Sequence, residues 1–270
     1  MTVRNHRFGA GRGRVSAALA VFALGAPAMA ADAFSTDWAK SAKSDARLVA
    51  AGPALAAFEI RLAPGAITYW RDPGDAGVPP TFDVSKSDNV ARIEASFPPP
   101  KRIAEPDGSE AFGYASGVTI PIRVVAADPS KPVTLALEAN YAVCEKLCLP
   151  ARAKLALALP GGPSPYAGAV EAALAAAPRT IAPAAFGALT GDAASGWRLC
   201  ADREAGPARD LFVEPPAGWW VAVAPGAPET ARDCFAVTLR EKPGDAVLPV
   251  SLRLTMTGGK GPVETTVLAQ

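Results

Sequence analysis

Two of the four cysteines in this chain, Cys144 and Cys148, are separated by only three residues. Apolar and polar residues alternate with period two from 133 to 143, and again from 154 to 159, which predicts a strand on each side of the pair. In a straight strand the two Cα atoms would lie roughly 13 Å apart, whereas a disulfide needs about 4.4–6.8 Å. If these cysteines pair, the chain must turn between them, and the simplest structure is a hairpin whose tip carries both sulfurs.

Three roles for this pair stay open on the residues alone. A small exposed ring is the kind of disulfide that opens and closes by thiol exchange. The same bond can be an inert clip, which contributes roughly 2 kcal/mol in the chain-entropy model. Two thiolates can also bind Cu(I), because soft ligands suit soft metals.

The first 30 residues have the pattern of a secretory signal peptide. Arg4, Arg7, Arg12 and Arg14 precede an apolar run from Val15 to Ala26, and Ala28-Met29-Ala30 is a typical cleavage site. The apolar run is too short to span a bilayer. We therefore expect a soluble periplasmic protein, in a compartment where disulfides persist.

Charge and histidine content narrow the function further. Residues 1–30 hold four of the 27 Lys and Arg and none of the 26 Asp and Glu, so the remainder carries a formal charge of −3, which argues against a nucleic-acid partner. The only histidine, His6, lies in the signal peptide. Its loss excludes Ser-His and Cys-His catalysis and every histidine metal site. Cysteine chemistry remains, and we expect no cofactor and no metal.

Turn residues and alternation predict an all-β fold. The chain has 27 Pro and 24 Gly, and short alternating segments recur between turns, as in β-sandwiches. We expect a sandwich domain over 31–160, a linker with a short helix over 161–180, and a second, smaller β-sandwich unit over 181–270. Residues 71–80 are dense in turn residues and are expected to be irregular, and Pro121 is expected to mark an edge strand or a bulge. Residues 258–261 are expected to form a hairpin turn.

The other two cysteines, Cys200 and Cys234, fall on the polar faces of their predicted strands. A bond between them would join neighbouring strands at a surface. The loop it closes is longer, worth roughly 4 kcal/mol in the same model. We interpret this pair as a structural disulfide.

Three ordered motifs resemble the N-terminal periplasmic domains of DsbD-type thiol:disulfide interchange proteins. The first is Tyr-Trp-Arg-Asp-Pro-Gly-Asp-Ala-Gly-Val-Pro over 69–79. Phe-Gly-Tyr at 112–114 leads to Ile-Pro-Ile at 120–122, and Tyr-x-Val-Cys-x-x-x-Cys-x-Pro ends at 150. The resemblance covers about residues 45–160 and is strongest to the branch that includes proteins for suppression of copper sensitivity. The best-known member spaces its cysteines more widely.

The resemblance implies an immunoglobulin-like sandwich with Cys144 and Cys148 as its redox-active, catalytic pair. Family members take electrons from a membrane-embedded thiol reductase and pass them to periplasmic thioredoxin-like or isomerase proteins, including factors of cytochrome c biogenesis. This chain lacks the family's transmembrane and thioredoxin-like parts, so we expect either that a separate membrane protein supplies the electrons or that the redox role is lost.

A loop beside the pair is the remaining candidate for the site. The segment 72–80 is expected to pack over the hairpin tip, with Tyr69 or Trp70 as a shield; an ordinary core position is the alternative for Trp70. The wider set of candidate shielding or loop residues is Tyr69, Trp70, Arg71, Pro73, Gly74, Asp75 and Gly77. Lys146 favours a thiolate nearby, whereas Glu145 opposes it.

The leading hypothesis is a thiol:disulfide interchange module of the protein-disulfide reductase type. The alternative is a non-catalytic periplasmic binding or structural module, copper-related in one version, whose pair is an inert disulfide or a Cu(I) ligand.

Overall fold

The computed structural model describes residues 1–3, 32–105, 108–206, 208–227 and 229–270. The expected signal peptide therefore lies almost entirely outside the described residues. Residues 32–270 form one compact unit. In the part of the chain that is described, no helix is long and apolar enough to cross a membrane.

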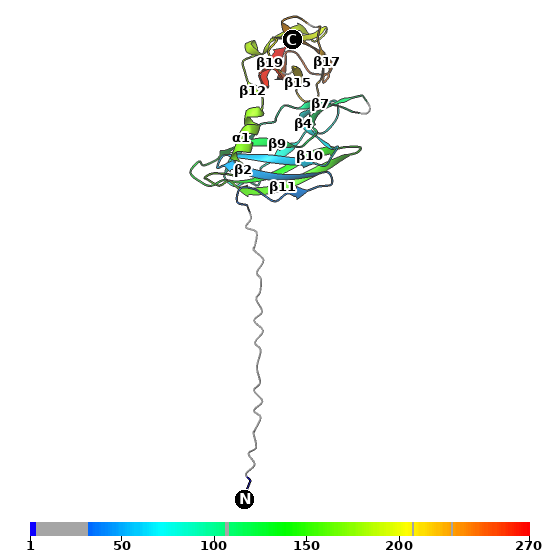
Figure 1. The fold of residues 1–270 in the computed structure, drawn as a ribbon. Coiled ribbons are helices and arrows are strands. Elements are labelled where there is room, and N and C mark those ends of the chain that lie inside the picture. The colour runs from blue at the N-terminus through cyan, green and yellow to red at the C-terminus, as the bar shows by residue number, and fades with distance from the viewer. Residues whose placement is uncertain (4–31, 106–107, 207, 228) are drawn as a thin grey trace. The chain divides into compact units, whose positions relative to one another are not determined.

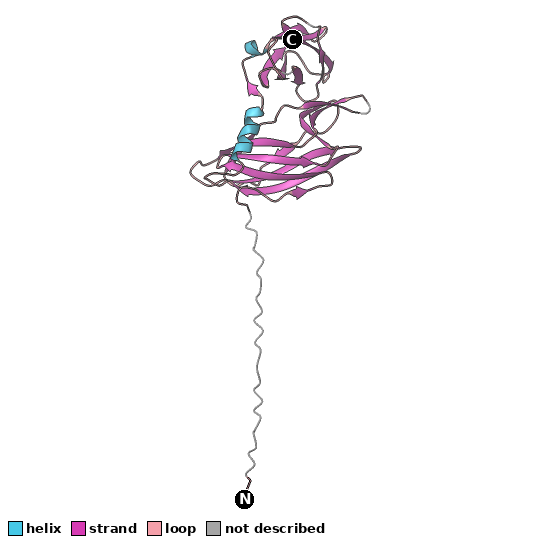
Figure 2. Ribbon diagram, viewed as in Figure 1, coloured by secondary structure: helices cyan, strands magenta, loops and turns pink. Residues whose placement is uncertain are grey.

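Strands dominate the fold, which confirms the all-β prediction (Figure 2). Two sheets come from residues 39–158. One has the order β1-β2-β3-β9-β6, with bounds Ala39–Lys40, Ser44–Gly52, Leu55–Leu62, Val118–Ala126 and Val90–Ala95. The other has the order β11-β10-β4-β8-β7, with bounds Cys148–Ala158, Thr134–Cys144, Ile67–Gly74, Glu110–Tyr114 and Lys101–Ala104, and β5 (Thr81–Asp83) also pairs with β10 (Figure 1).

Two further sheets come from residues 179–269. One has the order β12-β19-β18-β15, with bounds Arg179–Thr180, Val263–Ala269, Val250–Thr257 and Asp210–Glu214. The other has the order β13-β14-β17-β16, with bounds Ala188–Asp192, Gly196–Asp202, Arg232–Glu241 and Trp220–Pro225. We call the two pairs of sheets the first and second sandwich. Independent folding of each stays a prediction.

The helices are short and lie around the connection between the sandwiches. Helix α1 (Ala167–Ala176) falls inside the predicted span and buries Val170 against Val49 and Ala57 of the first sandwich. Helix α2 (Pro183–Phe186) buries Phe186 in the second core. The connection is therefore packed against both sandwiches.

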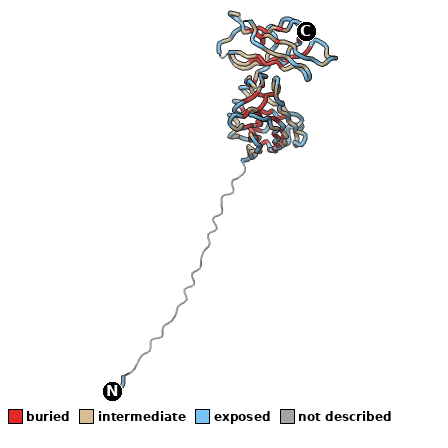
Figure 3. Tube along the Cα trace, turned by 90° about the vertical axis from the view of Figure 1, so that its right-hand side faces the viewer, coloured by how far each residue is buried: buried red, intermediate tan, exposed pale blue. Residues whose placement is uncertain are grey.

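Each sandwich encloses its own apolar core, and Figure 3 shows the buried residues of both cores in red. The largest fully buried side chains that the first sandwich gives to its core are Leu48, Phe58, Trp70, Ile120, Ile122, Leu135 and Leu137. Phe212, from β15 of the second sandwich, also belongs to that first core. The second core contains Leu199, Leu211, Leu252 and Leu254. The shared Phe212 ties the two sandwiches together through apolar packing.

Two local predictions were wrong. Pro121 is neither at an edge nor at a bulge, because β9 lies between β3 and β6, and the register shift in its pairing with β6 lies opposite Val125 and Ala126. Proline is tolerated there because β6 ends at Ala95. The Pro121 carbonyl accepts the last hydrogen bond between the two strands, from the Ser96 N–H at 2.8 Å. The N–H that proline lacks therefore falls where the pairing of β6 with β9 stops. Residues 71–74, expected to be irregular, continue β4, whose pairing with β8 is interrupted between Tyr69 and Gly74. The hairpin turn expected at 258–261 does join β18 to β19.

Candidate functional site

The two closely spaced cysteines close the tip of the β10–β11 hairpin, as their spacing predicts. The strands pair from Thr134 and Ala158 up to Cys144 opposite Cys148, and residues 145–147 form the turn. The two cysteines are joined by a disulfide, with 4.0 Å between their Cα atoms. The hairpin register alone therefore brings the sulfurs together.

The two sulfur-bearing residues differ sharply in their access to solvent. Cys144 is only 4% exposed and packs in a small cluster with Tyr69, Ala111 and Ala142. Cys148 is exposed, and it lines a cavity of about 550 Å³ together with Val78 and Pro79. A thiolate arriving from solvent can reach Cys148, whereas Cys144 is shielded by the protein.

Tyr69 is the polar partner of the disulfide. Its hydroxyl donates to Cys144 Sγ at 2.7 Å and lies 3.5 Å from Cys148 Sγ. Burial raises the pKa of the Tyr69 hydroxyl, and the negative charge of Glu105 raises it further, so the group stays protonated at neutral pH. A protonated phenol in this place can stabilise a thiolate that forms on Cys144.

Trp70, the other candidate shield, lies elsewhere. It is fully buried in the first core, where its ring meets Phe212 edge-on at 5.7 Å between centroids. Successive strand residues point to opposite faces, so Tyr69 and Trp70 cannot both face the cysteines. Trp70 is a core aromatic, and of these two residues it is Tyr69 that contacts the sulfurs.

The 72–80 loop packs on Tyr69. A Cβ added to Gly77, whose φ is +114°, would lie 2.3 Å from the Tyr69 ring, so the loop backbone touches the ring face. From there Val78 and Pro79 reach the cavity beside Cys148. The expected packing of this loop near the tip is therefore present, with Tyr69 between the loop and the buried sulfur.

The remaining loop candidates point away from the disulfide. Arg71 binds Glu214 and Glu264 of the second sandwich, and Asp75 accepts a hydrogen bond from Trp220. The backbone N–H of Gly74 donates to Asp72, which closes a tight turn at 3.0 Å. Pro73 is half-buried in the same turn. The contacts of Arg71 and Asp75 had no sequence signal, because their partners lie more than 140 residues away in the chain.

Charges at the hairpin tip are partly neutralised. Glu145 forms an ion pair with Lys43 at 2.8 Å, and that contact lowers the pKa of the Glu145 carboxyl. Lys146 is exposed in the turn. The carboxylate expected to oppose a thiolate is thus offset by Lys43, while Lys146 keeps a positive charge near the pair.

Cys200 and Cys234 also form a disulfide, directly opposite each other on β14 and β17. They point away from the core residues Leu199, Phe235 and Val237, as predicted, and they join neighbouring strands. The expectation of a surface position is wrong, since they are 7% and 8% exposed.

The carboxylate of Glu229 lies beside the second disulfide, within 4.8 Å of both sulfurs. The Gly226 N–H donates to the Cys234 carbonyl at 2.8 Å, one step beyond the pairing of β16 with β17. Within the described residues, Cys200, Cys234 and Glu229 are the group whose atoms lie close enough to hold a metal, but its sulfurs are bonded to each other and are not available as ligands.

Comparison with known proteins supports a relationship over the first sandwich. Residues 38–160 match the family model described as thiol:disulfide interchange protein DsbD, N-terminal. No curated protein sequence matches the chain. The fold is similar to the N-terminal periplasmic domain of ScsB from Proteus mirabilis, with a TM-score of 0.71 and 22% identity over 87% of this chain and 98% of that one. Residues 38–160, with the hairpin disulfide and the loop beside it, therefore belong to the DsbD N-terminal domain family and have its all-β, immunoglobulin-like fold.

Proposed function

We propose that this chain is a periplasmic thiol:disulfide interchange module. Cys144 and Cys148 relay electrons from a membrane-embedded thiol reductase to thioredoxin-like or isomerase proteins of the periplasm. One observation carries the proposal: an exposed cysteine is bonded to a buried cysteine whose sulfur accepts a hydrogen bond from a buried tyrosine at 2.7 Å. The family match supports thiol:disulfide chemistry in general.

Electrons enter through Cys148. A donor thiolate attacks the Cys148 sulfur, because that residue is exposed and Cys144 is not. A bond forms between the donor sulfur and Cys148, the Cys144–Cys148 bond breaks, and its electron pair goes to Cys144. The hydroxyl of Tyr69 then donates to a full negative charge, which is the stronger kind of hydrogen bond.

A second donor thiolate completes the reduction. It attacks the donor sulfur of the mixed disulfide, so the donor leaves oxidised and Cys148 leaves as a thiolate. Two electrons have moved, and two protons from solvent give the dithiol. Delivery runs the same steps in reverse, with the Cys148 thiolate attacking the disulfide of an acceptor and Cys144 resolving the mixed disulfide.

The surface around Cys148 suits contact with another protein. Leu147 is 71% exposed beside it, and Val78 is 58% exposed across the cavity. Exposed apolar residues grouped at one place are typical of interaction sites. The cavity of about 550 Å³ offers room for residues that flank a partner's cysteine.

A redox titration with thiol trapping tests this function. Cys144→Ser leaves Cys148 free to hold a partner, so we expect stable mixed disulfides with thioredoxin-like proteins, whereas Cys148→Ser should trap none. A potential below about −300 mV, together with no mixed disulfide, would identify an inert bond and favour the non-catalytic module instead.

A further inference from the structure

Strand β4, which carries Tyr69, also contacts the second sandwich. On β4, Tyr69 contacts the Cys144 sulfur, while the next two residues, Trp70 and Arg71, contact the second sandwich. No residue separates the two sets of contacts. Any shift of the second sandwich is therefore transmitted directly to the backbone that carries the Tyr69 hydroxyl.

Arg71 is held by a dense set of contacts. Its Nε and Nη2 donate to the two carboxylate oxygens of Glu214 at 2.8 Å, and Nη2 also donates to Glu264 at 2.8 Å. All three side chains are mostly buried, with 13–15% of their surface exposed. Bidentate contacts between arginine and carboxylate fix orientation as well as distance. This clamp, Arg71 with Glu214 and Glu264, fixes the end of β4.

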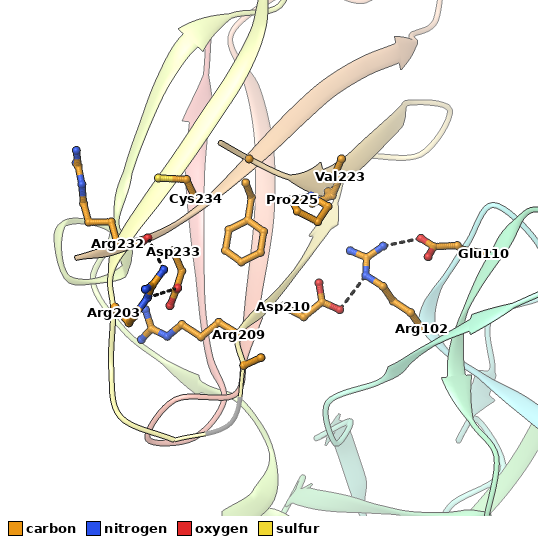
Figure 4. Close-up of a pocket in the computed structure, with 14 residues that line it drawn as sticks. Arg102, Glu110, Arg203, Arg209, Asp210, Val223, Pro225, Arg232, Asp233 and Cys234 are labelled. Atoms are coloured by element: carbon orange, nitrogen blue, oxygen red, sulfur yellow. Dashed lines mark hydrogen bonds and ion pairs between the residues drawn. The ribbon is translucent and has the colours of Figure 1, made fainter. Parts of the chain in front are cut away.

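Further contacts hold the same region. The indole N–H of Trp220 donates to Asp75 in the 72–80 loop at 3.0 Å. Beside it, Arg102 of β7 donates to Asp210 at 2.8 Å and also binds Glu110, as Figure 4 shows. The loop that Trp220 holds is the one that packs its Gly77 on the Tyr69 ring.

We propose that Arg71 and Asp75 are positioning residues through which the second sandwich holds Tyr69 and the 72–80 loop against the redox pair. The proposal rests on the proposed function and assigns a role to the second sandwich within it. With the contacts intact, the Tyr69 hydroxyl stays aimed at the Cys144 sulfur and stabilises its thiolate. Without them, β4 and the loop move more freely, and the thiolate loses part of that stabilisation.

The test compares two buried carboxylates with the same chemistry. Glu214→Gln weakens the clamp. Glu59→Gln is the matched control, because Glu59 pairs with Arg47 at 2.7 Å with similar exposure and touches neither the loop nor the second sandwich. Each change is made with Cys148→Ser, and the thiolate of Cys144 is titrated by its ultraviolet absorbance. We expect the titration midpoint to rise in Glu214→Gln, in the direction of Tyr69→Phe and by no more than that change, and to stay in place in Glu59→Gln.

The hydrogen bond between Trp220 and Asp75 in the 72–80 loop allows a second, independent test. Trp220 is 47% exposed, so Trp220→Phe removes its donor with little risk to folding. Asp75→Ala also removes the contact from the Glu110 N–H at 3.4 Å, so it should raise the midpoint at least as much as Trp220→Phe does, and adding Trp220→Phe to it should have no further effect. Asp75→Asn keeps an acceptor oxygen and should restore the wild-type value.

The outcomes separate a positioning role from a structural one. If Glu214→Gln and Trp220→Phe lower the melting temperature but leave the Cys144 titration at its wild-type midpoint, the contacts only hold the fold and the proposal is overturned. The titration needs no partner protein. A failure of exchange with partner proteins would therefore contradict the proposed function, while the titration of Cys144 would still test the positioning role.

Discussion

Replacing Tyr69 with phenylalanine removes one hydroxyl and tests the chemistry of the site most directly. The hydroxyl lies 2.7 Å from Cys144 Sγ, and Cys144 is 4% exposed, so water cannot easily take its place. The ring remains, and its packing against the 72–80 loop is kept. The change should therefore alter the sulfur chemistry far more than the fold.

The size of the effect follows from the charge on the acceptor. A hydrogen bond to a charged group contributes about 1.5–3 kcal/mol, and one between neutral groups about 0.5–1.5 kcal/mol. The thiolate thus loses about 1.4 kcal/mol more than the thiol or the disulfide does, which raises the pKa of Cys144 by about one unit. At a pH above the pKa of Cys144 the reduced form carries the thiolate and is destabilised relative to the disulfide, so the potential measured there should fall by about 30 mV.

Tyr141→Phe is the matched control for this experiment. Tyr141 lies on the same hairpin and is 4% exposed, but its hydroxyl meets Ser44 at 2.9 Å and no sulfur. Titration of the Cys144 thiolate and equilibration with glutathione measure the two quantities. An unchanged midpoint and potential in Tyr69→Phe, or the same shift in Tyr141→Phe, would refute the role assigned to the phenol.

Two further predictions concern proton uptake and the order of reduction. Burial raises the pKa of Asp72 to about 6, so the folded protein gains stability from protonating it below about pH 4 and loses that gain as the pH rises through 6. Asp72→Asn should therefore stabilise the protein at pH 7–8, with a higher melting temperature and a free energy of unfolding up to roughly 2–3 kcal/mol larger. This gain should vanish below about pH 4. An equal gain at every pH would contradict the reasoning. In partial reduction followed by alkylation and mass spectrometry, Cys144 and Cys148 should label before Cys200 and Cys234, because one sulfur of the first pair is exposed while the second pair is 7% and 8% exposed; the opposite order would exchange the two roles.

The hairpin could be predicted from the sequence because its information is local. Period-two alternation fixes which face of each strand is buried, and the short spacing of Cys144 and Cys148 demands a turn between them. The same reasoning placed Cys200 and Cys234 on neighbouring strands. It could not predict their burial, because Glu229 lies beside the two sulfurs and its position depends on ion pairs with Arg198 and Arg232.

The contacts that complete the site could not be predicted, because they depend on residues distant in the chain. The partner of Arg71 is 143 residues away, and that of Asp75 is 145 residues away. A turn-rich composition also hid the continuation of β4 to Gly74, since the strand is irregular there and its residues serve tertiary contacts. Local propensity yields to such contacts when they are many and buried.

The order of residues on β4 now has a physical explanation. A shift of one residue in the register of a strand moves every side chain to the other face. In β4 that shift would turn the Tyr69 hydroxyl into the apolar core and would aim the indole of Trp70 at the sulfur of Cys144. The buried phenol would then lack a partner, at a cost of about 1–3 kcal/mol, and the thiolate would face an indole N–H in place of the phenol. Tyrosine, tryptophan and arginine in immediate succession therefore meet three demands at once: a donor for the sulfur, a large side chain for the core, and a cation for the second sandwich.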